Sequence, residues 1–315
     1  MKLRQAWRSP VRDSPMMINN DRTVVAADGT RVAYGIHGDG PPVVLVNGLT
    51  TSVYYWDHLF PRWSRRFTLI TWDFKGHGRS EPARSPEGAT IPALADDLRR
   101  ILDDAGIDRA ALVGFSMGAQ VILEAYRAFP ERITALVPLF GPYQRVLDTA
   151  LGPFGRLIGA VVKRVPRGLF NAGARVVVQA GRLRAPYTVG QRLGLIGPNA
   201  SYGDVRRFLD HLRQIHPPTI QRMALSAQAH SAADVLPRIA VPTLVVTGDA
   251  DPFAPATKVG APMQRLIPGA ELLRMPHGTH TSLFEHYDEL DAAITGFFER
   301  HGLVVQAPAP AVEPS

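Results

Sequence analysis

Short apolar runs recur along the chain, and stretches with apolar residues near every third or fourth position lie between them. The clearest amphipathic stretch, residues 90–106, ends in a Gly where a helix C-cap would stand. Continuous apolar strands that alternate with such helices predict an α/β fold, with a mostly parallel sheet covered by helices on both faces. The predicted strands lie at 42–47, 67–73, 110–116, 133–141, 242–249 and, more weakly, 271–276.

A hairpin is predicted ahead of this sheet. Residues 23–27 and 31–36 are two short runs of alternating polarity, and Asp28-Gly29 lies between them. Asp-Gly between alternating runs is a strong signal for a tight turn, so we expect two antiparallel strands here.

The alternation stops between about Phe140 and Pro237, where no comparable strand periodicity occurs. This stretch is predicted to be a mainly helical insertion. Because open α/β sheets bind ligands at the carboxyl ends of their strands, we expect it to lie there as a cap. The predicted organisation is a disordered or extended N-terminal segment (1–21), a first core part (22–141), the cap insertion (142–236), a second core part (237–303) and a disordered tail (304–315).

The composition narrows the class of protein. With 45% apolar and 20% charged residues, the 315-residue chain is typical of soluble globular proteins. It has no cysteine, which excludes disulfides, thiolate metal sites and cysteine nucleophiles. Its basic start lacks the apolar core of a secretory signal, and no apolar run reaches the length of about 18 residues that a membrane-spanning helix needs. We therefore expect a cytoplasmic protein.

The net charge of +7 is concentrated in one part of the chain. Between Arg145 and Arg238, fourteen basic residues stand against four Asp and no Glu. This excess indicates either a solvated arginine-rich surface or a face for an anionic membrane or an acyl carrier. Residues 151–184 mix apolar and basic residues without an acidic one, as interfacial helices do, and peripheral membrane attachment is the alternative to a helix packed on the core. No segment resembles a nucleic-acid-binding module, so no nucleic-acid partner is expected.

A serine lies where a predicted strand meets a predicted helix. Gly114-Phe115-Ser116-Met117-Gly118 is a G-x-S-x-G sequence in the strand–turn–helix context that this pattern requires. The strained turn would point the hydroxyl of Ser116 into the cleft. The residues two before and two after the serine must be small, because strand and helix pass closely there. A purely structural serine is the less favoured alternative.

With this motif the chain resembles the α/β-hydrolase fold family, specifically its cap-bearing esterase and lipase branch. The resemblance covers roughly residues 22–141 and 235–300. Family members carry D-x-x-G-x-G-x-S after an early strand, and "DFKGHGRS" at 73–80 matches that pattern. The resemblance implies that this turn is structural, so Asp73 and His77 are expected to be architectural residues.

A serine hydroxyl needs an imidazole as general base, and the imidazole needs a carboxylate to orient it. In this fold the chain order is Ser, then Asp or Glu, then His. After the run at 242–249 the sequence offers Asp249 and Asp251. The family pattern G-x-x-D-x-x-x-P is matched by Gly248, Asp251 and Pro255, so the resemblance favours Asp251. Asp249 is the alternative and would otherwise be a turn residue.

Three histidines lie close together in "MPHGTHTSLFEH": His277, His280 and His286. In the family a glutamate follows the catalytic histidine by five residues and opens the final helix, and only His280 with Glu285 has this spacing. The residue before the histidine is usually Gly, whereas here it is Thr279. The resemblance favours His280, with His277 as the alternative and His286 facing solvent. The spacings match no standard metal site, so no metal is expected.

Acyl transfer also needs two N–H donors aimed at the developing oxyanion. The residue after the serine supplies one, the Met117 N–H. The family motif for the other is His-Gly-x, which corresponds here to Asn47-Gly48-Leu49, so the Leu49 N–H is the second. We expect the Asn47 side chain to hold this loop by hydrogen bonds. The aromatic residues beyond are expected to pack more than to contact substrate: Tyr54, Tyr55 and Trp56.

The predicted activity is hydrolysis of a small carboxylic ester with an apolar acyl group, through an acyl-enzyme and without a cofactor. Related dehalogenases and epoxide hydrolases use an aspartate nucleophile, so Ser116 argues against both. The same residues also suit thioester hydrolysis, acyl transfer, diketone cleavage or a lipase at a membrane surface. A non-catalytic ligand-binding protein on a hydrolase scaffold is the alternative from another class.

Overall fold

The computed structural model describes residues 18–149, 184–192 and 194–304. The expectations for residues 1–17 and 305–315, and for nearly all of the basic segment 151–184, lie outside these described residues.

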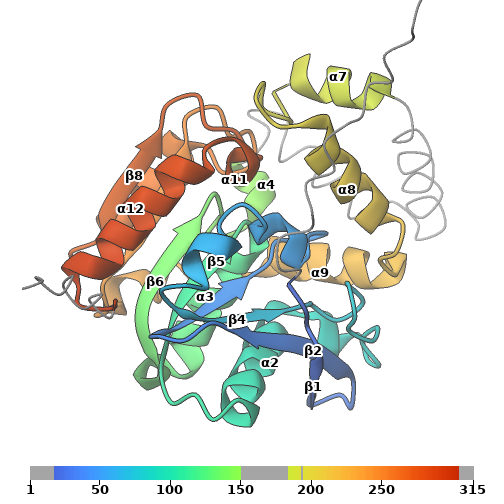
Figure 1. Ribbon diagram of the computed structural model, residues 1–315, viewed down its shortest axis with the longest axis vertical. Helices are drawn as coiled ribbons and strands as arrows, with labels where there is room; N and C mark the ends of the chain where they lie inside the picture. Colours follow the sequence, from blue (N-terminus) through green and yellow to red (C-terminus); the bar gives the residue numbers. More distant parts are fainter. Residues whose placement is uncertain (1–17, 150–183, 193, 305–315) are drawn as a thin grey trace, which may run out of the picture.

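Eight strands form one sheet in the order β1-β2-β4-β3-β5-β6-β7-β8 (Figure 1). From β4 through to β8 every neighbouring pair is parallel, whereas β2 pairs antiparallel with both β1 and β4. The predicted α/β fold, its mostly parallel sheet and the hairpin at Asp28-Gly29 are therefore confirmed. The strands are β1 (Arg22–Val25), β2 (Arg31–His37), β3 (Pro42–Val46), β4 (Thr68–Trp72), β5 (Ala110–Phe115), β6 (Ile133–Leu139), β7 (Leu244–Gly248) and β8 (Glu271–Met275).

Strand β6 ends earlier than its apolar sequence predicts. The run extends to Gly141, but the last residue in the strand is Leu139. The next residue, Phe140, has a φ of 47°, which turns the backbone out of the strand although the side chain stays buried. Apolar character alone therefore did not mark the end of the strand.

Helices cover both faces of the sheet, and two apolar clusters fill the layers between. Helices α2, α3 and α10 pack on one face, and α1 and α12 pack on the other. Along β5, Leu112 belongs to the first cluster and Ala111 and Val113 to the second, as the alternation of side chains along a strand requires. The helices outside the insertion are α1 (Phe60–Trp63), α2 (Ile91–Asp104), α3 (Met117–Ala128), α10 (Ala261–Leu266), α11 (Ser282–Glu285) and α12 (Tyr287–Arg300).

The predicted helix at 90–106 is α2, and local signals set both of its ends. The Thr90 side chain accepts a hydrogen bond from the Ala93 N–H at 3.3 Å, which caps the first turn. Gly106 has a φ of 66°, a conformation that ends a helix at low cost.

The chain between β6 and β7 is the insertion. Its described part contains no strand, one short 3₁₀ helix (Leu236–Arg238) and four α-helices: α4 (Val146–Thr149), α7 (Arg184–Arg192), α8 (Tyr202–Leu212) and α9 (Pro217–Ala229). Helices α7 and α8, drawn in yellow and olive in Figure 1, stand away from the sheet at one end of the molecule. Among the described helices, none is both long and apolar enough to cross a membrane.

Candidate active site

Ser116 occupies a sharp turn between β5 and α3. Its φ of 54° and ψ of −118° are unusual for a residue with a side chain. The flanking glycines allow this turn. A Cβ on Gly114 would collide with the carbonyl oxygen of Gly118, and one on Gly118 would lie 2.5 Å from the Val46 carbonyl oxygen. The G-x-S-x-G pattern thus has the steric basis expected from the sequence.

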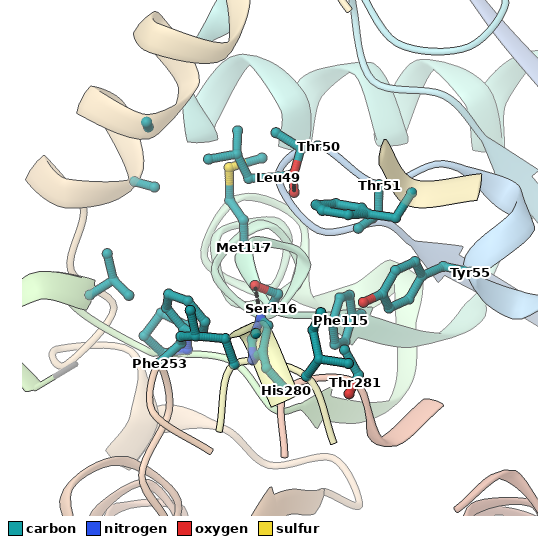
Figure 2. A pocket seen from close by; sticks show the side chains of 18 of the residues that line it. Leu49, Thr50, Thr51, Tyr55, Phe115, Ser116, Met117, Phe253, His280 and Thr281 are labelled. Carbon is teal, nitrogen blue, oxygen red and sulfur yellow. Dashed lines mark hydrogen bonds between the residues drawn. The ribbon is translucent and has the colours of Figure 1, made fainter. Parts of the chain in front are cut away.

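The ring of His280 lies beside Ser116 and connects it to Asp251. His280 Nε2 is 3.0 Å from Ser116 Oγ, and His280 Nδ1 is 2.9 Å from Asp251 Oδ2 (Figure 2 shows the first of these contacts). The side chain of His280 is 17% exposed and that of Asp251 is fully buried. Such an array can move a proton from the hydroxyl to the imidazole while the carboxylate fixes the ring.

The loop after β7 presents Asp251, and not Asp249, to the histidine. Asp251 Oδ1 accepts hydrogen bonds from the N–H groups of Phe253 at 2.8 Å and Ala254 at 3.1 Å, which leaves Oδ2 for His280. Asp249 points elsewhere and pairs with Arg274 at 2.7 Å. The alternative carboxylate is therefore not part of the array.

The two other histidines do not contact Ser116. His277 is exposed and has a φ of 58°. His286 is partly buried rather than facing solvent as expected, and its Nδ1 lies 3.8 Å from Glu289. Of the three, only His280 is brought to the serine.

Glu285 fixes the loop that carries His280. Its Oε1 accepts hydrogen bonds from the hydroxyls of Thr279 at 3.0 Å and Thr281 at 2.6 Å. Thr279, which departs from the usual Gly, therefore contributes a contact that Gly could not make. Glu285 ends α11 and does not open α12 as the sequence predicted, because His286 has a φ of −120° and a ψ of 30° that interrupt the helix.

The same carboxylate reaches the insertion. Asn199 donates its backbone N–H to Glu285 Oε2 at 3.2 Å. Gly197 packs so closely on the carboxylate that a Cβ there would collide with it. The backbone N–H of Gly197 also donates to the Thr281 hydroxyl at 2.9 Å. The histidine loop and this part of the insertion therefore share one hydrogen-bonded network.

The loop after β3 lies against Ser116 and is held by Asn47. The Asn47 side chain donates to the Trp72 carbonyl at 2.6 Å and accepts from Trp56 Nε1 at 2.9 Å, and it is almost fully buried. A Cβ on Gly48 would come within 3.0 Å of Ser116 Cβ. The expectation that Asn47 holds the loop is confirmed by these contacts.

Two backbone N–H groups near Ser116 have no acceptor in the part of the chain that the structure describes. They belong to Leu49, in the loop after β3, and to Met117, at the first position of α3. In Figure 2, Leu49 and Met117 lie on one side of Ser116 and His280 lies on the other. These donors are therefore available to an oxygen bound next to the serine.

Ser116 and His280 open into a cavity of about 560 Å³ between the sheet and the insertion. Its lining is largely apolar, and α4, α8 and α9 all contribute to it. The insertion supplies many of these apolar side chains, among them Val146, Leu147, Ile196, Phe208, Leu209 and Leu225.

The aromatic residues after the Asn47 loop divide between packing and the cavity. Trp56 is buried, and its indole N–H donates a hydrogen bond to the Asn47 side chain. Tyr55 stacks on Phe115 with ring centroids 4.7 Å apart, yet it also lines the cavity. Burial raises the pKa of Tyr55, so its hydroxyl stays neutral at physiological pH. Tyr55 therefore packs, as the sequence favoured for these aromatic residues, and also lines the cavity.

Asp73 and His77 lie away from the array and have structural contacts. Asp73 accepts hydrogen bonds from Ser52 at 2.5 Å and Asn20 at 3.1 Å. The His77 ring is buried, with Nδ1 3.1 Å from the Lys75 carbonyl oxygen. These contacts agree with the expectation that Asp73 and His77 have a structural role.

The sequence patterns did not identify the cavity walls. Phe253 and Phe284 pack beside His280 and Tyr55, and both line the cavity. Phe253 lies inside the matched G-x-x-D-x-x-x-P segment, so its place two residues after Asp251 was the one signal present. No comparable signal marked the residues of the insertion.

Comparisons with known proteins agree with this architecture. The sequence model of the family described as alpha/beta hydrolase fold matches residues 41–287. An uncharacterized protein of Mycobacterium bovis is 32% identical over 128 residues, which cover 41% of this chain and 36% of that protein. The chain thus spans about a third of the length of this relative.

Two further relatives match over most of their length. RutD of Azorhizobium caulinodans, a proposed carbamate hydrolase, is 26% identical over 84% of this chain and 93% of its own. The solved structure of the esterase RhEst1 from a Rhodococcus species superimposes with a TM-score of 0.70, at 22% identity, over 88% of this chain and 98% of that chain. Since the family model covers most of the chain and the sheet has the corresponding topology, the protein belongs to the α/β-hydrolase family.

Proposed function

We propose that this protein is a serine hydrolase that cleaves carboxylic esters with an apolar acyl group. The observation that carries the proposal is the contact of Ser116 Oγ with His280 Nε2 at 3.0 Å, at the wall of a largely apolar cavity. A hydroxyl with an imidazole at this distance, and a buried carboxylate behind the imidazole, is the arrangement that activates serine for attack on a carbonyl.

In this mechanism His280 Nε2 takes the proton of Ser116 as Oγ attacks the ester carbonyl carbon. Asp251 stabilises the imidazolium and holds the Nδ1 proton. The N–H groups of Leu49 and Met117 donate to the oxyanion of the tetrahedral intermediate. His280 then protonates the leaving alkoxide, and the acyl group remains on Ser116 Oγ.

Water completes the cycle by the same proton transfers in the second half-reaction. His280 removes a proton from the water, the hydroxide adds to the acyl-enzyme carbonyl, and the C–O bond to Ser116 breaks. The serine recovers its proton from His280, and the carboxylic acid leaves. No cofactor takes part in these proposed steps.

The apolar lining supports the choice of acyl group. Burying each methylene contributes about 0.8 kcal/mol, so a cavity lined mostly by apolar side chains favours an alkyl or aryl acyl chain. The esterase name of the Rhodococcus structure and the hydrolase name of RutD are consistent with acyl transfer to water.

The proposal is tested with p-nitrophenyl esters of increasing acyl length and with a fluorophosphonate label. We expect turnover that Ser116→Ala abolishes, together with labelling of Ser116 alone. Ser231→Ala, which changes an exposed serine outside the cavity, is the matched control and should behave like the unchanged protein. A protein that neither turns over any of these esters nor reacts with the label would contradict the proposal, and carbamate and thioester substrates in the same assay identify the nearest alternatives.

A further inference from the structure

One part of the cavity wall is lined by amides instead of apolar groups. Gln120 on α3 and Gln221 and Gln228 on α9 all line the cavity. Gln120 is completely buried, and Gln228 is nearly so. Buried amides are costly unless they are hydrogen-bonded, so their partners show which polar atoms remain available to a ligand.

The amide of Gln120 is fixed in one orientation. Its Nε2 donates to the Ala227 carbonyl at 2.9 Å and, with a longer contact, to the Gln144 carbonyl at 3.4 Å. Both acceptors are carbonyl oxygens, so the nitrogen must face them and Oε1 must face the other way. Within the described residues, Oε1 of Gln120 has no hydrogen-bond partner.

The neighbouring amide of Gln228 is used differently. Its Oε1 accepts a hydrogen bond from the Leu147 N–H at 2.9 Å. The carbonyl oxygen of this second buried glutamine is therefore already satisfied by the protein, whereas that of Gln120 is not. Of these two buried glutamines, Gln120 alone has a carbonyl oxygen without a partner among the described residues.

Gln120 also lies close to the proposed reaction centre. Ser116 is the residue before the first turn of α3, and Gln120 follows four positions later on the same helix. Four residues correspond to about 6 Å along a helix axis, and residues four apart share a face. A substrate bound at Ser116 can therefore place a group near Gln120 a few bonds from its scissile carbonyl.

We propose that Gln120 is a specificity-determining residue whose Oε1 accepts a hydrogen bond from a hydroxyl or amide N–H of the substrate. The substrate class is then an ester with an otherwise apolar body that carries one such donor a few bonds from the scissile carbonyl. This inference rests on the proposed function, since it concerns the substrate of the same site.

The test compares esters that differ only in this donor. The probes are p-nitrophenyl 3-hydroxyoctanoate, its 3-methoxy analogue and the 3-acetamido ester, which separate a hydroxyl donor, no donor and an N–H donor. A second pair, the 3-hydroxybutyl and 3-methoxybutyl esters of octanoic acid, places the donor on the alcohol side. We expect kcat/KM for a donor-bearing ester to exceed that of its methoxy partner by about tenfold, the effect of one net hydrogen bond.

The variant Gln120→Met removes the acceptor and keeps the length of the side chain. It should bring the donor-to-methoxy ratio close to one. Gln264→Met is the matched control, because Gln264 also donates Nε2 to a backbone carbonyl, that of Ala270 at 3.0 Å, but lies outside the cavity lining. This control should keep the ratio of the unchanged protein.

The outcomes separate the two proposals. Hydrolysis of all these esters by the unchanged protein with ratios near one overturns the role of Gln120 and leaves the serine hydrolase intact. A ratio that survives Gln120→Met also overturns it. Failure to hydrolyse any ester or to react with the fluorophosphonate contradicts the proposed function and, with it, this inference. The comparison within the unchanged protein does not depend on the folding of any variant.

Discussion

The choice between Asp249 and Asp251 depends on where each carboxylate is held. Asp251 is buried and receives two backbone N–H groups on one oxygen, which directs the other to His280. Asp249 is 38% exposed and pairs with Arg274 at the surface. Two aspartates separated by one residue thus have different surroundings.

Asp251→Asn should lower kcat/KM for ester hydrolysis by about 10⁴-fold, because an amide stabilises the wrong tautomer of the imidazole and cannot balance its charge. Asp249→Asn removes only a surface ion pair and should stay within about twofold of the unchanged protein. Steady-state kinetics of the two variants check this. Equal losses would show that the two carboxylates are not distinguished by the reaction.

Asn47 links the proposed oxyanion loop to two tryptophans through both ends of its amide. Asn47→Leu removes both hydrogen bonds and should lower the free energy of unfolding by about 1–3 kcal/mol, because buried polar groups of Trp56 and Trp72 lose their partner. Since the loop also carries the Leu49 N–H, kcat should fall more than KM rises. Urea unfolding and ester kinetics measure the two effects.

Trp56→Phe removes the indole N–H that donates to Asn47 but leaves the bond from Asn47 to the Trp72 carbonyl in place, so kcat should fall less than in Asn47→Leu. Its loss of stability includes a cavity term, because Trp56 is fully buried and Phe is smaller. A loss of stability in Asn47→Leu with kcat unchanged would contradict a link between this side chain and the oxyanion loop.

At the level of elements, a buried ion pair joins α2 to the turn after β4. Lys75 Nζ lies 3.1 Å from Asp97 on α2 and 3.3 Å from Asp28 in the hairpin, and it donates to the Gly88 carbonyl at 3.0 Å. Burial raises the pKa of Asp97 to about 7 although Lys75 opposes this shift. The lysine therefore offsets only part of the cost of burying the Asp97 carboxylate.

Lys75→Met should destabilise the protein by about 3–5 kcal/mol at pH 8, where it leaves buried carboxylates without their counter-ion. The loss should be smaller at pH 6. There the pKa of Asp97, raised further without Lys75, lets its carboxyl take a proton. Lys258→Met, at an exposed lysine, is the control and should change stability little. A loss independent of pH would contradict this account of Asp97.

The strands and α2 could be predicted from the sequence, because local patterns determine them. Apolar runs became β3 to β8, and Thr90 and Gly106 frame α2. The end of β6 could not be predicted, since Phe140 remains buried after the backbone has left the strand. The break between α11 and α12 was missed as well, because no sequence signal marked the non-helical backbone of His286.

The candidate site likewise contains some residues that the sequence identified and others that it did not. Ser116, Asp251 and His280 each follow the end of a strand and stand in short motifs. Their order along the chain left Asp249 and His277 as alternatives, and the family patterns favoured Asp251 and His280. Gln120 and the apolar cavity wall were not found. Their meeting depends on how α4, α8 and α9 pack over the sheet, which is a long-range property without a local pattern.

For the molecule as a whole, two buried histidines connect the core to the insertion. The rings of His77, after β4, and His211, on α8, lie with centroids 6.0 Å apart. Burial lowers the pKa of His77 to about 4, and it lowers that of His211 although nearby Asp73 opposes this. Tyr54 also packs on His211, and burial keeps its hydroxyl neutral by raising its pKa.

Because burial lowers the pKa of both histidines, the folded protein should lose stability as the pH falls. Unfolded histidine has a pKa of about 6.5, so between pH 6.5 and 4 the unfolded chain binds more protons than the folded protein. The contribution of His77 to stability is therefore present above pH 6.5 and lost as the pH falls, by up to about 1.4 kcal/mol per pH unit.

His77→Gln should consequently show a shallower fall in unfolding free energy between pH 7 and pH 4.5 than the unchanged protein. Urea titrations at several pH values measure the unfolding free energies of the two proteins. Titratable groups common to both, such as Asp97, contribute nearly equally, so their effects largely cancel in the difference between the two free energies. His286→Gln, at a partly exposed histidine, should reproduce the slope of the unchanged protein. Parallel curves for the unchanged protein and His77→Gln would contradict the burial of a neutral imidazole.

The network around Glu285 limits which segments of this protein can be exchanged independently. One carboxylate receives the Asn199 N–H of the insertion and the hydroxyls of Thr279 and Thr281, which flank His280. A chimaera that exchanges only the residues between β6 and β7 would therefore remove a support of the histidine loop. New substrate pockets from a related protein should be transplanted together with residues 279–285, so that the two segments move between proteins as one module.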